Sequence, residues 1–278
     1  MKEDNDSRQN WLIASRSWAS LGAPQKPSPE DVVITERAIS DASRRLDRPL
    51  KALLLGVTQE LAGCQWPTGT EVVAVDNTMA MIETLWPAPR APAGSSAICA
   101  DWRDLPLHDA SIDIALGDGS FNAVPFEDWA RLCMQLHRVL VTSGTAAIRV
   151  FLRCDQAETM TELRRLVSEG AIGSIHALKW RIAAVLQKEL RDGVRLCDIW
   201  DAWQQIAAAA EPIRGRPGWR DDQVATLDRY RTSAIAYYFP TAAEFRSSVS
   251  PWFAEQRVGF GTYELAERCP TFTLERRD

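Results

Sequence analysis

Short apolar runs alternate with amphipathic segments through the middle of this chain. Between residues 50 and 153, five apolar runs of strand length are separated by turns and helix-like segments. The predicted strands are KALLLG (51–56), EVVAVD (71–76), SSAICAD (95–101), SIDIALGDG (111–119) and TAAIRVFLR (145–153). Residues 126–140, before the last of these, have the apolar period of an amphipathic helix. Short strands joined by crossover segments indicate a parallel sheet with helices on both faces.

Helical patterns flank this region on both sides. Residues 1–48 have the pattern of amphipathic helices, with Trp11 and Trp18 on one face, and Ser28 followed by a proline predicts a helix start. After the fifth strand the pattern predicts four helices, over 156–169, 176–192, 196–210 and 221–236. The end of the chain is predicted to form a helix over 241–253 and two strands, EQRVGFG and CPTFTLER.

These elements predict an α/β fold with a mostly parallel, seven-stranded sheet. The predicted divisions are an N-terminal helical extension (1–48), a core formed by 49–154 and 241–278, and a helical cap (155–240) inserted after the fifth strand. The cap leaves from a strand end, so we expect it to lie over the edge of the sheet where ligands bind.

Composition excludes several classes of protein. The chain has 278 residues, is 46% hydrophobic and carries a net charge of -5, which is typical of a soluble protein with no nucleic-acid partner. No apolar run reaches the ~18 residues of a membrane span, and no signal peptide is evident, so we expect a cytoplasmic protein. The six cysteines form no CxxC pair, and no histidine lies at ligand spacing from them, so no metal site is predicted.

Three successive strand ends carry groups suited to a nucleoside. Gly56 ends the first strand, where the lack of a side chain allows close approach of a ligand. Asp76 ends the second strand 20 residues later, the spacing of the acid that binds ribose hydroxyls in dinucleotide folds. Asp101 and Trp102 follow the third strand. Simpler explanations are a turn glycine at Gly56 and capping roles for Asp76 and Asp101.

The turn after the first strand favours a nucleoside without phosphates. Its sequence, GVTQELAG, contains neither the G-x-G-x-x-G of a dinucleotide-binding turn nor the GK[ST] of a P-loop. A nucleoside that carries an amino-acid tail instead would need polar partners, such as Thr58 and Glu60.

Several stretches resemble the class I S-adenosylmethionine-dependent methyltransferases. They are LLLGVTQEL, VVAVDNTMAMI, AICADWRDLPLHDASIDIALGDGSFN, LHRVLVTSGTAAIRVFLR and, near the end of the chain, ELAERCPTFTLERR. The resemblance covers about residues 50–153 and implies a Rossmann-like fold, S-adenosylmethionine as cofactor and S-adenosylhomocysteine as product. The first motif departs from the family's GxGxG, because only Gly56 is present.

The resemblance implies a role for each matching position. Gly56 would lie under the methionine part of the cofactor, Asp76 would bind the ribose hydroxyls, and Met79 would lie beneath the adenine. Asp101 would accept a hydrogen bond from the adenine amino group, and Trp102 would flank the ring. The full set of expected cofactor residues is Gly56, Thr58, Glu60, Asp76, Asn77, Met79, Asp101, Trp102, Asp118 and Gly119.

The stretch after the fourth strand is expected to border the reacting methyl group. Asp118 and Gly119 would lie at the methionine end of the cofactor, and Phe121 and Asn122 are candidate substrate contacts. Asp118 would either act as a general base or hold the cofactor's amino group, and we favour the second. His176, the only histidine in the predicted cap, is another candidate base, although such a histidine is more often a cap or surface residue.

The predicted cap is rich in tryptophan and arginine. These residues either form ordinary amphipathic helices or recognise a planar or anionic small molecule, and Arg214 and Arg216 are the predicted substrate contacts. We therefore predict methyl transfer from S-adenosylmethionine to an oxygen or nitrogen of a small molecule. The alternatives are a peptide or protein methyltransferase, and a degenerate protein that keeps the fold as a cofactor-binding or scaffold module. The sequence leaves the oligomeric state open.

Overall fold

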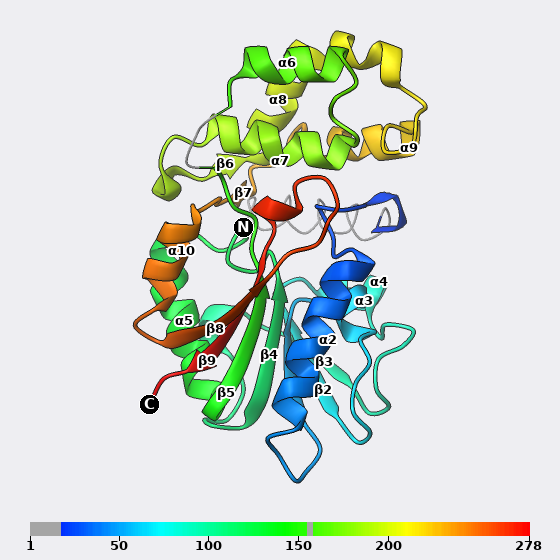
Figure 1. The fold of residues 1–278 in the computed structure, drawn as a ribbon. Coiled ribbons are helices and arrows are strands. Elements are labelled where there is room, and N and C mark those ends of the chain that lie inside the picture. Colours follow the sequence, from blue (N-terminus) through cyan, green and yellow to red (C-terminus); the bar gives the residue numbers. More distant parts are fainter. Residues whose placement is uncertain (1–17, 155–157) are drawn as a thin grey trace.

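A seven-stranded sheet forms the centre of the molecule, and helices cover both of its faces (Figure 1). The structure is a computed structural model that describes residues 18–154 and 158–278. The strand order is β3-β2-β1-β4-β5-β9-β8, in which β1 to β5 are parallel and β9 is antiparallel to both neighbours. The predicted fold class, a mostly parallel Rossmann-like sheet, is confirmed.

The helices fall into two groups, one that flanks the sheet and one that lies above the carboxyl ends of its strands. The strands are β1 (Lys51–Leu55), β2 (Glu71–Asp76), β3 (Ser96–Cys99), β4 (Ile112–Asp118), β5 (Leu140–Arg149), β8 (Phe253–Gly259) and β9 (Thr271–Arg276). The flanking helices are α2 (Pro29–Ser43), α3 (Gln59–Ala62), α4 (Met79–Leu85), α5 (Trp129–Val139) and α10 (Ala242–Val249). Above the carboxyl ends of the strands lie α6 (Met160–Ser168), α7 (Ile175–Leu186), α8 (Leu196–Ile206) and α9 (Asp221–Val224) (Figure 1).

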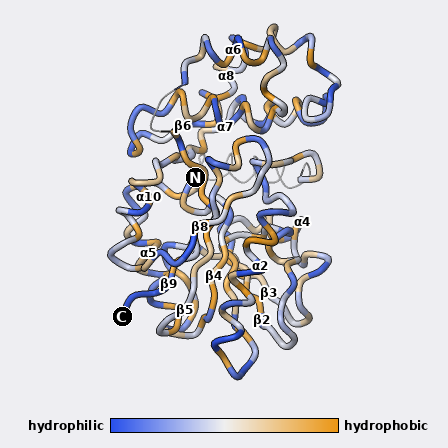
Figure 2. Tube along the Cα trace, in the orientation of Figure 1, coloured by the Kyte–Doolittle hydropathy of each residue, from blue (hydrophilic) through white to orange (hydrophobic). Residues whose placement is uncertain are grey.

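Alternate residues of the central strands pack on opposite faces of the sheet, so both faces need helices. On β1, Leu53 and Leu55 belong to the hydrophobic cluster that includes residues of α5 and α10. Ala52 and Leu54 belong to the cluster that includes residues of α2, α3 and α4. This period of two is that of a β-strand. Figure 2 shows the hydrophobic residues concentrated along the central strands.

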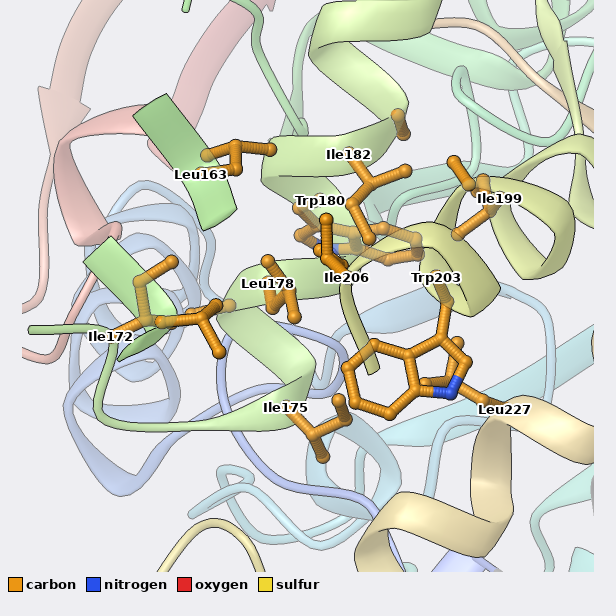
Figure 3. Close-up of a cluster of buried hydrophobic side chains, with 14 of the residues drawn as sticks. Leu163, Ile172, Ile175, Leu178, Trp180, Ile182, Ile199, Trp203, Ile206 and Leu227 are labelled. Atoms are coloured by element: carbon orange, nitrogen blue, oxygen red, sulfur yellow. The ribbon is translucent and has the colours of Figure 1, made fainter. Parts of the chain in front are cut away.

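The helices above the sheet have a hydrophobic core of their own. Figure 3 shows part of this cluster, in which Leu178 of α7 and Trp203 of α8 lie among aliphatic side chains of neighbouring segments. We call residues 158–240 the cap. This cluster also includes Phe151 after β5 and Leu265 and Cys269 before β9, so the cap packs onto the ends of these strands.

Two predictions about strands and helices are wrong in detail. The predicted helix over 221–236 ends at Val224, a 3-10 turn follows over Ala225–Tyr230, and β7 (Ala236–Tyr237) pairs with β6 (Val194–Arg195). Strands of two residues show no alternation that a sequence pattern can reveal. Strand β5 begins at Leu140 and not at 145, because the chain stays in the sheet through an irregular register with β4.

Helix α2 begins where the sequence predicts. Ser28 Oγ accepts a hydrogen bond from the Asp31 backbone N–H (3.2 Å), and an Asp31 carboxylate oxygen accepts one from the Ser28 N–H (2.8 Å), which forms a capping box. Residues 18–28, called the N-terminal segment here, precede this helix, and Trp18 opens the segment in a 3-10 turn. The other tryptophan expected on the same face, Trp11, lies outside the described residues.

None of the helices in the described ranges has both the length and the apolar composition that spanning a membrane requires.

Asn122 joins the cap to the sheet. Its side chain is fully buried, and its Nδ2 donates to the carbonyl oxygens of Phe151 (2.8 Å) and Tyr238 (2.7 Å). Its Oδ1 accepts from the Phe151 N–H (2.9 Å), and its own carbonyl oxygen accepts from the Tyr238 N–H (2.9 Å). Since Phe151 follows β5 and Tyr238 follows β7, one side chain connects the end of the sheet to the segment that returns from the cap.

Replacing Asn122 with alanine is expected to lower the free energy of unfolding by about 2–4 kcal/mol, because each buried backbone group left without a partner costs ~1–3 kcal/mol. Chemical denaturation measures this change. Asn77→Ala removes an exposed asparagine and serves as the matched control, with little expected effect. Equal stability of the two variants would show that Asn122 does not fasten the cap.

Candidate cofactor and acceptor site

A pocket of about 270 Å³ opens beside the carboxyl ends of β2 and β3. Its lining consists of Asp76, Asn77, Asp101, Trp102, Arg103, Ala123, Val124, Pro125 and Ile235. The structure thus brings together four of the predicted cofactor residues, the loop after β4 and one residue of the cap. This is the edge of the sheet at which α/β folds bind ligands.

Gly56 adopts a conformation that side chains rarely allow. Its φ is +97°, and a Cβ at this position would lie 3.7 Å from Trp102 Cζ2 and 3.8 Å from Asp76 Oδ2. Trp102 is held there because its Nε1 donates to the Val75 carbonyl oxygen (2.5 Å), which also accepts from the Gly56 N–H (2.8 Å). The glycine therefore keeps the space between the Asp76 carboxylate and the indole ring open.

Asp76 is a buried carboxylate without a basic partner among the described residues. One of its oxygens accepts a hydrogen bond from the Thr78 N–H (2.8 Å), so the side chain does not cap α4, whose N-cap is Thr78. Burial raises the pKa of Asp76 to about 6, against the opposing effect of the hydrogen bonds from Thr78. A ligand that offers hydroxyl donors would stabilise the charged form of this group.

Asp101 is paired, unlike Asp76. It accepts from the backbone N–H of Arg103 (2.8 Å), and the Arg103 guanidinium contacts both of its oxygens and also Asp128 (2.5 Å). The hydrogen bonds from Arg103 hold the pKa of Asp101 below its ordinary value. Sequence reasoning missed Arg103, although its position two residues after Asp101 is the spacing of a local capping contact.

The remaining residues around the first turn face different surroundings. Glu60 accepts hydrogen bonds from Trp18 Nε1 (3.2 Å to each oxygen) and lies 3.3 Å from Lys26 Nζ, so it is bound to the N-terminal segment. Thr58 is buried at the N-cap position of α3 and makes no capping hydrogen bond. Met79 is 52% exposed at the start of α4, which leaves its side chain available to a ligand.

Asp118 forms a buried ion pair with Arg149. The two side chains are 2.6 Å apart, and the Arg149 guanidinium also contacts Asp31 (3.4 Å) and donates to the Pro24 carbonyl oxygen (2.7 Å). Burial raises the pKa of Asp118, and the charge of Arg149 opposes that rise. Gly119 has a φ of +62°, and a Cβ there would lie 2.5 Å from the Phe151 ring, so this glycine is required by packing.

Phe121 and Asn122, two predicted substrate contacts, are buried in the structure. Phe121 is 1% exposed and packs edge-on against Trp129 and Phe245, with ring centroids 5.3 Å apart in both pairs. The side chain of Asn122 is fully buried, and its hydrogen bonds go to backbone groups. Both residues follow β4 closely, and the chain turns them into the interior and not towards the pocket.

Arg214 and Arg216, the other predicted substrate contacts, lie on the surface of the cap. Both are exposed and follow the 3-10 turn Ala207–Ile213, which packs against α6 on the side of the cap away from the sheet (Figure 1). Arg214 lies 3.5 Å from Glu211, one turn earlier. Neither residue lines the pocket at the strand ends. Because this segment is exposed to solvent, charged side chains such as these two arginines are expected in it.

His176 is enclosed and neutral. Its side chain is 1% exposed, with Nδ1 3.0 Å from Gln25 Oε1 and Nε2 3.1 Å from the Ser20 carbonyl oxygen. Burial, with the nearby charge of Lys179, lowers the pKa of His176 to about 3. These contacts hold the ring against the N-terminal segment, and it is not a general base in this arrangement.

Comparison with known proteins places the central part of the chain in one family. A family model described as a methyltransferase domain matches residues 55–148, about a third of the chain, from the end of β1 to β5. No curated protein matches the chain in sequence.

Solved structures share the fold at low sequence identity. A protein from Rhodobacter sphaeroides, provisionally described as a Zn-dependent alcohol dehydrogenase, has a TM-score of 0.63 and 14% identity over 98% of this chain and 99% of its own. An S-adenosylmethionine-dependent methyltransferase from Methanosarcina mazei has a TM-score of 0.50 and 13% identity, covering 90% of this chain and 98% of its own.

A third structure holds ligands. It is the 1,6-didemethyltoxoflavin-N1-methyltransferase of Burkholderia thailandensis with bound 1,6-didemethyltoxoflavin and S-adenosylhomocysteine, with a TM-score of 0.51 and 14% identity over 100% of this chain and 90% of its own. At these identities the structures show the fold, and the family model shows the kind of domain. Residues 55–148 thus match a methyltransferase domain, and the chain shares its fold with S-adenosylmethionine-dependent methyltransferases.

Proposed function

We propose that this enzyme methylates a nucleophilic oxygen or nitrogen of a small-molecule acceptor. The observation that carries the proposal is the cover over the strand ends. The cap contributes Ile235 to the pocket, Asn122 ties the cap to the loops after β4 and β5, and the N-terminal segment contacts both sheet and cap. A closed arrangement of this kind suits a small acceptor held away from water.

The pocket fits the adenosine part of the cofactor. Asp76 supplies a buried carboxylate for the two ribose hydroxyls, and the Gly56 turn leaves room for the backbone to approach the ligand. The half-buried Trp102 ring and the exposed Met79 side chain would flank the adenine, with Asp101 at its edge. Asn77, which also lines the pocket, completes this set.

Four further residues are proposed for the methionine part of the cofactor: Thr58, Glu60, Asp118 and Gly119. Glu60 and Asp118 have protein partners in the present arrangement, Lys26 and Arg149 respectively. Both carboxylates would have to share or exchange these partners to hold the cofactor's amino group.

The protein's part in the reaction is mainly positioning. The cofactor supplies an electrophilic methyl group together with its own leaving group. The chain has to hold the acceptor atom in line with that methyl group and exclude water from the site. Asp118 is held by Arg149, and His176 is held by the N-terminal segment. We therefore expect positioning of the acceptor to accelerate methyl transfer more than a general base from either residue would.

The direct test is calorimetric titration of the full chain with S-adenosylmethionine and S-adenosylhomocysteine, followed by a search for acceptors by release of S-adenosylhomocysteine. Micromolar binding and turnover with a small molecule would support the proposal. Binding without turnover on small molecules, but with turnover on peptides, would favour the protein methyltransferase. Lack of binding would favour a degenerate scaffold.

Asp76→Ala is expected to weaken the binding of S-adenosylhomocysteine at least about tenfold, because one lost charge-assisted hydrogen bond costs roughly 1.5–3 kcal/mol. In the wild-type protein, affinity should also fall as the pH drops below about 6, where the free Asp76 carboxyl gains a proton. Isothermal titration at several pH values measures both effects. Asp47→Ala, at an exposed loop position, is the control, and equal affinities of the two variants would refute the assignment.

Gly56→Ala is expected to lose most of its cofactor affinity. A Cβ at this position would enter the space between Trp102 and Asp76, and the positive φ adds strain. Gly94→Ala is a matched control, because Gly94 also has a positive φ (+82°) but no neighbour within 4 Å. Titration calorimetry compares the affinities, and thermal denaturation compares the strain. If the Gly56 variant binds as well as the Gly94 variant, the first turn does not approach the cofactor.

A further inference from the structure

Lys179 is completely buried, yet no acidic side chain of the described residues neutralises it. Its Nζ donates to Gln25 Oε1 (3.0 Å) and Thr226 Oγ1 (2.5 Å), and it lies 5.1 Å from the centre of the Tyr230 ring. An ammonium group enclosed by neutral partners is costly, and burial accordingly lowers the pKa of Lys179 well below its ordinary value. An anion in place of one neutral partner would reverse this cost.

The Gln25 side chain is the neutral partner at the centre of this cluster. Its Oε1 lies 3.0 Å from Lys179 Nζ and 3.0 Å from His176 Nδ1, and its Nε2 lies 2.8 Å from the Tyr230 hydroxyl. His176 and Lys179 are three residues apart in α7, so they project from the same side of the helix. One planar amide from the N-terminal segment thus contacts three side chains of the cap.

A carboxylate has the same planar shape as this amide and suits the three side chains better. One of its oxygens would accept from Lys179 and from His176 in the neutral tautomer that carries its proton on Nδ1, and the other from the Tyr230 hydroxyl. Burial raises the pKa of Tyr230 to about 12, so the phenol keeps its proton and remains a donor. The charges of Arg229 and Lys26 also act on His176, and both favour an anion here.

The cluster adjoins the end of β4, where the reacting methyl group is expected. Pro24, the neighbour of Gln25, accepts a hydrogen bond from Arg149 through its carbonyl oxygen (2.7 Å), and Arg149 is paired with Asp118 (2.6 Å). Two successive residues of the N-terminal segment therefore connect the strand end to the cap cluster. A small acceptor bound between the end of β4 and the cap cluster would reach both of them.

We propose that Lys179, His176 and Tyr230 bind the carboxylate of the methyl acceptor, and that the Gln25 amide occupies this place when no acceptor is bound. The inference rests on the proposed function and narrows it, because the acceptor becomes a small carboxylic acid. Binding of the acceptor displaces Gln25 and gives Lys179 the counter-ion that the described residues do not provide.

The first experiment replaces Gln25 in the full-length protein. Gln25→Glu places a carboxylate beside Lys179 and is expected to raise Tm by about 2–4 °C near neutral pH, an increase absent when Lys179→Met is added. Gln25→Ala leaves the place open, and acetate should then raise Tm, whereas acetamide and chloride at the same concentration should not. Tyr230→Phe, which removes only a hydroxyl, should weaken this acetate effect several-fold and keeps the test valid if Lys179→Met fails to fold.

The second experiment asks whether a carboxylate displaces Gln25 in the wild-type protein. With S-adenosylhomocysteine present, acetate but not acetamide is expected to speed hydrogen exchange in residues 18–28. Unchanged exchange, or a Gln25→Ala variant that ignores acetate, would overturn the proposal.

The carboxylate of the cofactor itself is the rival occupant. S-adenosylhomocysteine carries a carboxylate and 5′-methylthioadenosine does not, so Lys179→Met should leave the affinities of both unchanged if the cluster serves the acceptor. A loss confined to S-adenosylhomocysteine would assign the cluster to the cofactor and overturn the proposal. Failure of both nucleosides to bind the wild-type protein would instead refute the proposed function, whatever the acetate result.

Discussion

The buried ion pair of Asp118 and Arg149 is the contact on which the arrangement of the site depends. The two residues end the neighbouring strands β4 and β5, and their side chains are only 5% and 3% exposed. Arg149 also contacts Asp31 in α2, the Pro24 carbonyl oxygen and the Tyr263 hydroxyl. Desolvation removes much of the stability that such a pair would contribute, but losing one partner leaves an uncompensated charge, so the pair fixes where these segments meet.

Three acidic residues at successive strand ends show how partners decide what a carboxylate can do. Asp101 is held by Arg103 and Asp118 by Arg149, so both already have a cation within hydrogen-bond distance. Within the described part of the chain, Asp76 has only the donors of Thr78, and its pKa is raised by burial. Of the three, Asp76 gains the most from hydroxyl donors that arrive with a ligand.

The sequence predicted the parts of the site that depend on local pattern. The strand ends at Gly56 and Asp76 followed from short apolar runs and a spacing of 20 positions. Asp76 lines the pocket, and Gly56 lies beside it. The same reasoning predicted that Asn122 contacts the substrate. Residue type alone does not show whether a side chain in a turn faces a pocket or the interior of the protein. The contact of His176 with Gln25 joins residues 151 positions apart, and only the packing of the cap on the N-terminal segment brings them together. Long-range contacts of this kind have no periodic trace in a sequence.

Two buried ionisable groups of opposite sign, Asp76 and Lys179, lack a charged partner among the described residues. Asp76 ends β2 in the pocket, and Lys179 faces the N-terminal segment from the cap. Folding alone gives no reason to bury either group, since each would be more stable paired or exposed. Their retention is explained if the nucleoside brings hydroxyl donors to Asp76 and the acceptor brings an anion to Lys179. The folded protein would then be complementary to two ligands at once. The Asp118–Arg149 pair, through the contact of Arg149 with Pro24, holds the strand ends and the N-terminal segment in fixed positions beside both ligands.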